Sequence, residues 1–199
     1  MTTEAFQCNF VQVIKAAKLC LDQDLQMPSL ILVYSLIDTF AWAVAGPREK
    51  NSRTRFESWV SRWICAFEPL PCTPTELYAA RCAVLHSLTS KADLNVSGKI
   101  RQVVYAWGPA KLSVLQDSIG VIGQPNLVGV HINELLDAVV VGMDRTFTAA
   151  TTDARLRRNL DEAASLHFAH MKRDSLDQLM ELHRQHSTLM RSVPPATEA

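Results

Sequence analysis

The chain has no excess of charge of either sign. Its 199 residues include 20 lysines and arginines and 20 aspartates and glutamates, so the formal net charge at pH 7 is zero. Proteins that coat nucleic acid without sequence preference depend on a large positive charge, and this balance argues against that class. A local basic groove is still compatible with the composition. With 48% apolar residues, the chain has ample material for a hydrophobic core.

Features that would place the chain in or across a membrane are also lacking. The N-terminus carries Glu4, Gln7 and Asn9, where a signal peptide would have a basic start and an apolar run. The longest apolar stretch, Leu30 to Ala45, is too short to span a bilayer comfortably and contains Asp38. Five cysteines, an odd number, stand in apolar segments and indicate reduced, buried thiols: Cys8, Cys20, Cys65, Cys72 and Cys82. We therefore expect a cytoplasmic protein without membrane contact.

The first half of the chain has the apolar periodicity of helices. A helix over 3–23 is predicted from apolar residues at steps of three and four. A second helix, capped by Ser29, is predicted to end near Ala45 and to be central in the core, because it is apolar almost all round. Two more helices are predicted at 56–67 and 73–89. Four helices with short connections favour a helical bundle.

The helix over 73–89 has the clearest start in the chain. Thr73 is suited to the N-cap, Pro74 to the first helical position, and Glu76 completes a capping box with Thr73. In such a box the hydroxyl accepts the N–H of the third helical residue, and the glutamate accepts the N–H of the cap. The sequence therefore predicts a well-anchored helix that carries Arg81 and His86.

The second half of the chain differs from the first in amino-acid composition. Segments 100–107 and 127–132 are rich in β-branched residues and predict two short strands, with a short helix near 110–119 between them. A helix capped by Asn133 is predicted to follow, then one that starts at Thr151-Thr152-Asp153, and a last one capped by Ser175. The expected fold class is mainly α, with a bundle over 1–95 and a β-hairpin plus C-terminal helices over 96–192 packed on it as one compact domain. Residues 193–199 are expected to be a disordered tail.

Arg81 and His86 are the residues that a purely structural helix would not need. Five positions apart, they lie about 140° apart around a helix axis and about 7.5 Å apart along it, so they do not share a face. One copy of the helix would struggle to bring them together. Two copies across a two-fold axis would place both pairs in one electropositive groove, and the small residues Ala79, Cys82 and Ala83 would allow close approach. The alternative is a core helix with a snorkelling arginine and a hydrogen-bonded histidine.

Asp38 is the one ionisable residue of the predicted second helix. An unpaired buried charge is very costly, so the carboxylate needs a partner, and Arg81 or His86 is the natural candidate. The alternative is an exposed position at the helix edge. Two basic stretches, the predicted loop 46–55 and the cluster Arg155, Arg157 and Arg158, are interpreted as solvated surface, although the loop could also contact phosphates.

The pattern over residues 3–90 resembles the HEPN superfamily of small α-helical bundles. It consists of two long helices, an acidic residue in the second (Y-S-L-I-D, Asp38) and a later R-C-A-V-L-H string from Arg81 to His86. The resemblance implies a bacterial protein that forms a dimer with Arg and His of both chains at the interface. Many members are metal-independent endoribonucleases of toxins and phage-defence systems, and others bind nucleotides or have lost catalysis. Catalytic members often carry a polar residue directly after the arginine, where this chain has Cys82.

The resemblance implies roles for Arg81, His86 and Asp38 in cleaving RNA without a metal or cofactor. The 2′-hydroxyl would attack the adjacent phosphorus, with His86 transferring the proton, Arg81 holding the phosphate and Asp38 orienting either one. Two alternatives stay open. One is a noncatalytic bundle whose helices, including those over 153–191, hold a homodimer or a protein partner, and the other is a nucleotide-binding module. The histidine pairs at 167/170 and 183/186 have no cysteine or carboxylate to complete a metal site.

Overall fold

The computed structural model of this chain describes residues 3–46, 49–89, 100–166 and 177–185. The chain divides into two compact units, Met1–His167 and Phe168–Ala199. The second unit contains a helix at 177–185, inside the predicted helix that Ser175 was expected to cap. The predicted tail at 193–199 lies outside the described residues. Every other described helix and strand belongs to the first unit, which is mainly α-helical with a small two-stranded sheet, as predicted.

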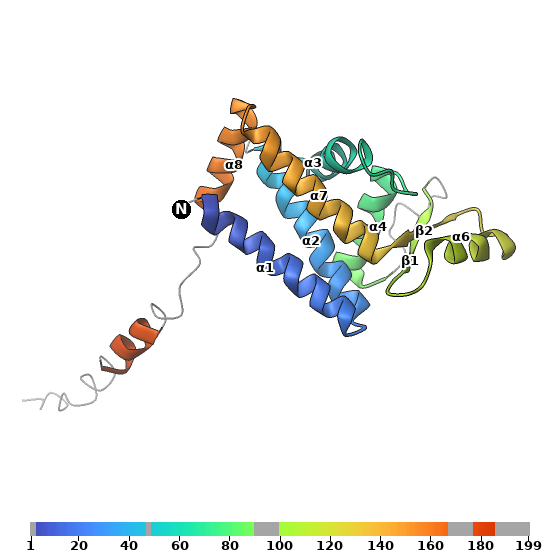
Figure 1. Cartoon of the computed structure of the whole chain (residues 1–199), viewed down its shortest axis with the longest axis horizontal. Helices are drawn as coiled ribbons and strands as arrows, with labels where there is room; N and C mark the ends of the chain where they lie inside the picture. The colour runs from blue at the N-terminus through green and yellow to red at the C-terminus, as the bar shows by residue number, and fades with distance from the viewer. Residues whose placement is uncertain (1–2, 47–48, 90–99, 167–176, 186–199) are drawn as a thin grey trace, which may run out of the picture. The chain divides into compact units, whose positions relative to one another are not determined.

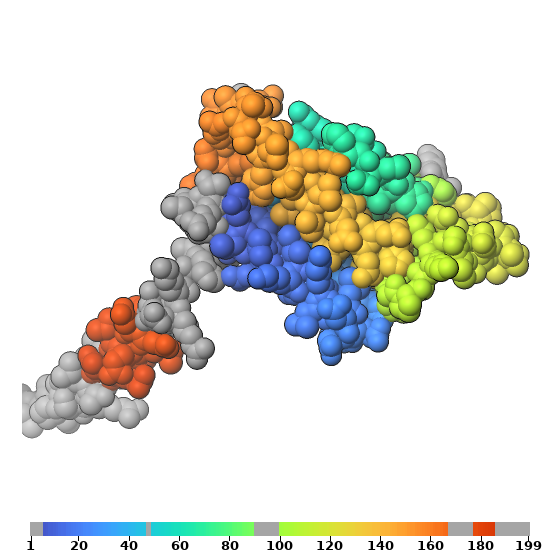
Figure 2. Space-filling model, viewed as in Figure 1, coloured from blue at the N-terminus to red at the C-terminus, as the bar shows by residue number. Residues whose placement is uncertain are grey.

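Helix α2 (Gln26–Ala45) is the central element of the first unit. It packs against five other helices, which are α1 (Thr3–Asp22), α3 (Ser52–Trp59), α4 (Pro74–Ser87), α7 (Ile132–Ala150) and α8 (Ala154–Leu166). Figure 1 shows α1 and α7 running along α2, and Figure 2 shows α7 filling the space between α1 and the α3 region on this face. A helix that is apolar almost all round needs neighbours on most of its sides, which confirms the predicted central position.

The start of α2 differs from the prediction, and Ser29 is not its cap. The Ser29 hydroxyl is buried and donates to the backbone carbonyl of Ala17 on α1, at 3.1 Å. The chain turns at Asp24, whose φ of 55° is left-handed, and the helix begins after Leu25 with no side-chain cap. Pro28 is accommodated in the first turn because the N–H groups there have no partner within the helix. The serine therefore joins α1 to α2.

The third helix begins earlier than predicted, because Asn51 caps it. The Asn51 side chain accepts the N–H of Thr54 at 3.1 Å. Helix α3 then continues into a π-helical segment, η1 (Val60–Cys65). Gly142 of α7 lies against this segment, and a Cβ at that position would lie 3.0 Å from the carbonyl oxygen of Trp63. The glycine therefore permits a close approach between α7 and η1.

Helix α4 begins with the predicted capping box. The N–H of Glu76 donates to Thr73 Oγ1 at 3.2 Å, and the N–H of Thr73 donates to Glu76 Oε2 at 2.8 Å. The Glu76 carboxylate also accepts from Arg101, from Nε at 2.7 Å and from Nη2 at 3.0 Å. Arg101, just before the first strand, was not recognised from sequence as a partner of the cap. The box therefore also ties α4 to the sheet.

The two predicted strands are present but do not form the predicted hairpin. Strands β1 (Gln102–Ala106) and β2 (Leu127–His131) pair in parallel, with Val103 opposite Val128. Helix α6 (Leu112–Val121) lies in the connection between them. A hairpin needs a short antiparallel turn, whereas a connection that includes a helix returns the chain to the same end of the sheet. The expected β-hairpin is therefore wrong, and the segment is a small β-α-β unit.

The starts of the last two helices of the first unit show one wrong prediction and one confirmed prediction. Asn133 does not cap α7, because its side-chain oxygen accepts the N–H of Gly108 at 3.2 Å and the helix begins before it. Helix α8 starts where predicted, and Asp153 caps it, because its Oδ1 accepts the N–H groups of Arg155 and Leu156, both at 3.0 Å. The asparagine therefore fixes the end of β1 against α7.

One hydrophobic core contains residues from both predicted halves of the chain. The ring of Phe40 on α2 lies at its centre, with centroids 5.1 Å from Phe10, 5.4 Å from Trp59 and 5.2 Å from Phe147. The core also includes residues of the strands and of α8. The described parts of 1–95 and 96–192 up to residue 166 therefore form one compact unit, while the packing of the last helix on the bundle stays a prediction.

The apolar face of α8 is used inside the first unit. Its buried residues pack against α2 and α7, and they are Leu156, Leu160, Ala163 and Ala164. The sequence-based alternative assigned the helices over 153–191 to a partner surface. The buried apolar face of α8 is not available to another protein, and the assignment of a partner to the helices over 153–191 stays a prediction.

Candidate functional site

Arg81 joins the other two predicted site residues within a single chain. Its Nε donates to Oδ2 of Asp38 on α2 at 2.5 Å, and Nη2 forms an ion pair with the same oxygen. Its Nη1 lies 3.0 Å from Nε2 of His86, which stands in the last turn of α4. The structure therefore places Asp38, Arg81 and His86 in one cluster, and Asp38 has the partner that its apolar setting predicted.

The expectation that one helix could not bring Arg81 and His86 together is wrong. The angle of about 140° describes where the two side chains leave the backbone. It does not include the length of the arginine side chain, which can extend along and around the helix to a neighbour one turn away. The guanidinium therefore reaches the imidazole directly, and a two-fold axis is not needed to assemble the pair.

The hydrogen bond between Arg81 and His86 gives one nitrogen of the imidazole a defined role. A guanidinium has only N–H donors, so Nε2 of His86 is the acceptor in this contact. The contact therefore holds the ring with Nε2 against the guanidinium.

The cluster extends from the partly buried face of α4 to solvent. The side chains of Arg81 and Asp38 are 15% and 22% exposed, and His86 is exposed. Burial lowers the pKa of Arg81, but hydrogen bonding to Asp38 and the charge of that carboxylate outweigh burial and raise the pKa above its ordinary value. The guanidinium is therefore a permanent cation, held in place on one side and in contact with an accessible imidazole on the other.

Tyr78 supports the cluster and was not recognised from sequence. The Arg81 guanidinium carbon lies 5.8 Å from the centroid of the Tyr78 ring, and that of Arg53 lies 6.0 Å from it. The Tyr78 hydroxyl is 3.3 Å from the hydroxyl of Ser52 at the start of α3. A ring three residues before the arginine on one helix was the available signal, since such positions are neighbours. Tyr78 therefore positions Arg81 between α3 and α4.

A cavity of about 300 Å³ opens beside the carboxylate and guanidinium of the cluster. It is lined by Asp38, Thr39, Trp42, Ser52, Arg55 and Arg81. Arg55 comes from the basic segment 46–55 that was predicted to be a loop able to contact phosphates, and its Nη1 donates to the carbonyl of Glu49 at 2.8 Å. Two arginines from different helices therefore border one cavity. His86 is not among the residues that line it.

The small residues of α4 are covered by the same chain. Ala79 and Ala83 are 0% and 1% exposed, and Ile100 and Cys82 pack against them. The sequence-based expectation assigned this face to a second copy of the helix. Because it is already buried, packing of two α4 helices through Ala79 and Ala83 is wrong as an explanation of a dimer.

The cysteines and histidines form no recognisable metal site in the described ranges. Among those residues, no three histidine, cysteine, aspartate or glutamate side chains are grouped closely enough to hold a metal ion. Of the two histidine pairs, only His183 is described. All five cysteines are free thiols, but the expectation that they are buried holds only for Cys72, and Cys8 is exposed. Burial, followed by the nearby charge of Glu76, raises the pKa of Cys72 to about 12.

One described helix, α2, has the length and composition of a membrane-spanning segment. At 20 residues it is longer than the stretch from Leu30 to Ala45 judged from sequence, because the helix begins at Gln26. The argument from insufficient length is therefore wrong. Half of its apolar window is buried inside the structure, which is also what a core helix shows. A cytoplasmic location stays a prediction.

Comparisons of the chain with protein-family models, with curated proteins and with solved structures find no match. The resemblance to the HEPN superfamily therefore rests on Asp38, Arg81 and His86 and on the helical bundle that carries them. Since one fold hosts many functions, function has to be argued from the chemistry of this cluster and its cavity.

Proposed function

We propose that this protein is a HEPN-like, RNA-binding endoribonuclease that works without a metal ion at the Asp38–Arg81–His86 cluster. The observation that carries the proposal is the chain of contacts in which one guanidinium binds a carboxylate and an imidazole. A positioned cation and a neutral imidazole are the two groups that cleavage by a 2′-hydroxyl requires. Both lie in a single protomer, and the cation borders a cavity with a second arginine.

Phosphate binding is supported by Arg81 and Arg55. A guanidinium presents several N–H donors in a plane and pairs well with phosphate oxygens. Asp38 uses Nε and Nη2 of Arg81, so Nη1 is the part of the guanidinium that an RNA phosphate would engage. Arg55, on the neighbouring helix, would contact the next phosphate of the strand or the same one. Binding should therefore weaken as salt is added.

Binding of a phosphate would also release the base for the reaction. In the proposed step, a phosphate oxygen accepts the hydrogen bond that Nη1 now donates to His86, which leaves Nε2 able to accept the 2′-hydroxyl proton. The 2′-oxygen forms a bond to phosphorus and the bond from phosphorus to the 5′-oxygen breaks. Water supplies the proton that the departing 5′-oxygen takes up, and the hydroxide that remains takes the proton from His86. The products are a 2′,3′-cyclic phosphate and a 5′-hydroxyl.

A homodimer is part of the proposal but is not needed to complete the cluster. Leu88, two residues after His86, is 60% exposed and offers an apolar contact to a second copy. Such a contact would bring two clusters to one RNA without either protomer lending a residue to the other. Sedimentation velocity of the wild-type protein and of Leu88→Asp measures whether the chain self-associates through this surface.

The proposal is tested with single-stranded RNA labelled at its 5′ end and incubated with the protein in EDTA. Wild-type protein should cut the strand and leave a 2′,3′-cyclic phosphate. His86→Ala should reduce the rate by about 100-fold or more, because general base catalysis is typically worth that much. Arg81→Lys keeps the charge but loses the planar fork, so it should lower both binding and cleavage.

His183→Ala is the matched control, because His183 is an exposed histidine of the second unit. It should leave cleavage unchanged. If wild-type protein neither binds nor cuts RNA, or if His86→Ala and Arg81→Ala bind and cut as well as the wild type, the proposal is wrong. Binding that depends on Arg81 without any cleavage would reduce the proposal to an RNA-binding function.

A noncatalytic helical interaction module is a second candidate, and one observation favours it. The Arg81 guanidinium is already engaged by Asp38, His86, Cys82 and Tyr78, so it does not need a ligand to satisfy its donors. A purely structural ion pair would look the same. In that case Arg81→Ala would lower stability, and the wild-type protein would neither bind nor cut RNA. The same set of variants therefore distinguishes the two candidate functions.

A further inference from the structure

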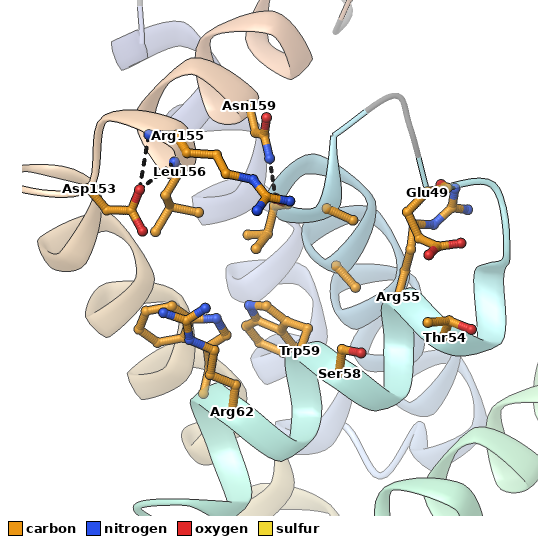
Figure 3. A pocket seen from close by; sticks show the side chains of 14 residues that line it. Glu49, Thr54, Arg55, Ser58, Trp59, Arg62, Asp153, Arg155, Leu156 and Asn159 are labelled. Atoms are coloured by element: carbon orange, nitrogen blue, oxygen red, sulfur yellow. Dashed lines mark hydrogen bonds between the residues drawn. The ribbon is translucent and has the colours of Figure 1, made fainter.

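A second cavity, of about 310 Å³, lies between α2, α3, η1 and α8. Its apolar wall includes Val44, Trp59 and Leu156, and its polar rim includes Arg62 and Arg155. Figure 3 shows Arg155 extending from α8 over the cavity and Arg62 rising from below it. A volume near this size is at the lower end of the range for small-molecule sites, about 300 to 1,000 Å³.

The two rim arginines form no side-chain hydrogen bond or ion pair in the described part of the chain, although their charges contribute, after the N–H of Leu156, to the lowered pKa of Asp153. The Arg62 guanidinium lies over the ring of Trp63, with its carbon 4.8 Å from the centroid. For neither Arg62 nor Arg155 does a described residue provide a hydrogen bond or an ion pair to the side chain. A third arginine at this cavity, Arg55, donates to the carbonyl of Glu49. Two guanidinium groups are therefore directed to one cavity with their donors unused.

The two carboxylates at this cavity are engaged by backbone groups. Asp153 accepts the N–H groups of Arg155 and Leu156 as the cap of α8. Glu49 Oε1 accepts the N–H of Asn51 at 2.8 Å. Neither carboxylate forms an ion pair with a rim arginine among the described residues. The charges at the cavity, three arginines against two carboxylates, leave an excess of one positive charge.

The π-helical segment η1 is an independent sign that this wall is specialised. It carries both Arg62 and Trp63, and π-helical turns are rare and frequent at functional sites. The extra residue per turn changes the direction in which following side chains point. Gly142 keeps α7 close behind the segment, as its missing Cβ would lie 3.0 Å from the Trp63 carbonyl. The chain therefore accommodates an unusual turn where Arg62 reaches the cavity.

We propose that this cavity binds a small phosphomonoester with a compact apolar body. Arg62 and Arg155 hold the dianionic phosphate, and the wall of Val44, Trp59 and Leu156 receives the apolar part. An uncharged molecule of the same shape would leave the two guanidinium groups unmatched, and inorganic phosphate would leave the apolar wall unused. This site contains none of Asp38, Arg81 and His86, although Arg55 lines both cavities. The proposal does not depend on the ribonuclease activity.

The test is isothermal titration calorimetry of the full chain with phenyl phosphate, inorganic phosphate and phenol. Phenyl phosphate should bind with one saturable site and more tightly than either fragment. Arg62→Ala and Arg155→Ala should each weaken its binding by about tenfold or more, the equivalent of one charge-assisted hydrogen bond. Both side chains are exposed, so these variants should fold, and their thermal unfolding without ligand checks this.

Arg158→Ala is the matched control, because Arg158 is an exposed arginine of α8 that does not line the cavity. It should bind phenyl phosphate as the wild type does, and so should His86→Ala, which separates this site from the proposed ribonuclease site. The proposal is overturned if phenyl phosphate does not bind at millimolar concentration. It is also overturned if binding is equal for inorganic phosphate or is unchanged in Arg62→Ala and Arg155→Ala.

Discussion

Helix α4 contributes one residue to each of two arginine–carboxylate pairs, and the two pairs differ in the further groups that they contact. At its N-terminus, the side chain of Glu76 is 8% exposed and binds both Arg101 and the N–H of Thr73. In its middle, Arg81 binds Asp38 and then continues to His86, which is exposed. The first pair is hydrogen-bonded to the cap of the helix, whereas the second pair contacts an imidazole that is exposed to solvent.

The comparison shows that the presence of an ion pair does not identify a functional site. The Glu76–Arg101 pair uses both carboxylate oxygens and contributes to the attachment of α4 to the sheet. In the Asp38–Arg81 pair both nitrogens bind the same oxygen, Oδ2. One guanidinium nitrogen of Arg81 is left to contact the imidazole. We therefore expect changes to the first pair to affect stability and changes to the second to affect activity as well.

The largest stability effect is expected from Glu76→Ala. It removes the glutamate half of the capping box of α4 and both acceptors of Arg101, and should lower the free energy of unfolding by about 2 to 3 kcal/mol. Urea denaturation followed by circular dichroism measures the loss. Glu76→Gln, which keeps a side-chain oxygen for the cap, should lose clearly less. A loss below about 1 kcal/mol in Glu76→Ala would show that the pair is not a main anchor of the helix.

A double-mutant cycle on Asp38 and Arg81 should give a smaller energy. Because both side chains are partly exposed, we expect a coupling of about 1 to 2 kcal/mol, between the values for surface and for buried pairs. Urea denaturation of Asp38→Ala, Arg81→Ala and the double variant supplies the cycle. A coupling energy larger than that of the Glu76–Arg101 pair would mean that Asp38–Arg81 is the main structural pair of the two.

The pH dependence of stability should distinguish Glu76 further. Burial raises the pKa of Glu76, but hydrogen bonds from Arg101 and from the N–H of Thr73 outweigh it, so the pKa lies below the ordinary value of 4.5. The charged form is therefore favoured by folding. Its contribution is present above the ordinary pKa and is lost as the pH falls through the lowered one. The stability difference between wild type and Glu76→Gln should shrink in acid, and a constant difference would contradict the shift.

The smallest stability effect is expected from His86→Ala. The imidazole is exposed and makes one described hydrogen bond, to Arg81, so its loss should change the free energy of unfolding by less than about 0.5 kcal/mol. The same variant should lose RNA cleavage. Thermal unfolding and the cleavage assay on one preparation separate the two effects. A large loss of stability would place His86 with the structural pair instead.

Local patterns in the sequence predicted much of the fold and part of the site. The capping box of α4 was predicted in full because its groups lie within three residues of one another. The partner of Asp38 was predicted from the cost of an unpaired charge in an apolar helix. The roles of Tyr78 and Arg55 were missed, since both depend on how α3 lies next to α4.

The wrong predictions about caps and strand pairing have one physical cause, which is that they concern distances across the fold. Ser29 and Asn133 were assigned to caps by residue type, but a hydroxyl or amide bonds to whichever group packing brings near, here Ala17 and Gly108. The hairpin was preferred although a helix was predicted between the strands. The direction of strand pairing depends on where that helix returns the chain, and the residues next to the strands do not determine it.

By itself, the sequence determined the helices, their central apolar member and the need of Asp38 for a cation, because these follow from local propensity and from solvation. Only the tertiary structure decided that Arg81 reaches Asp38 and His86 in one chain, since that contact depends on the distance between α2 and α4 and on the reach of a long side chain. It also decided that Arg62 and Arg155 share a cavity. These residues are far apart in sequence, and only packing brings them together.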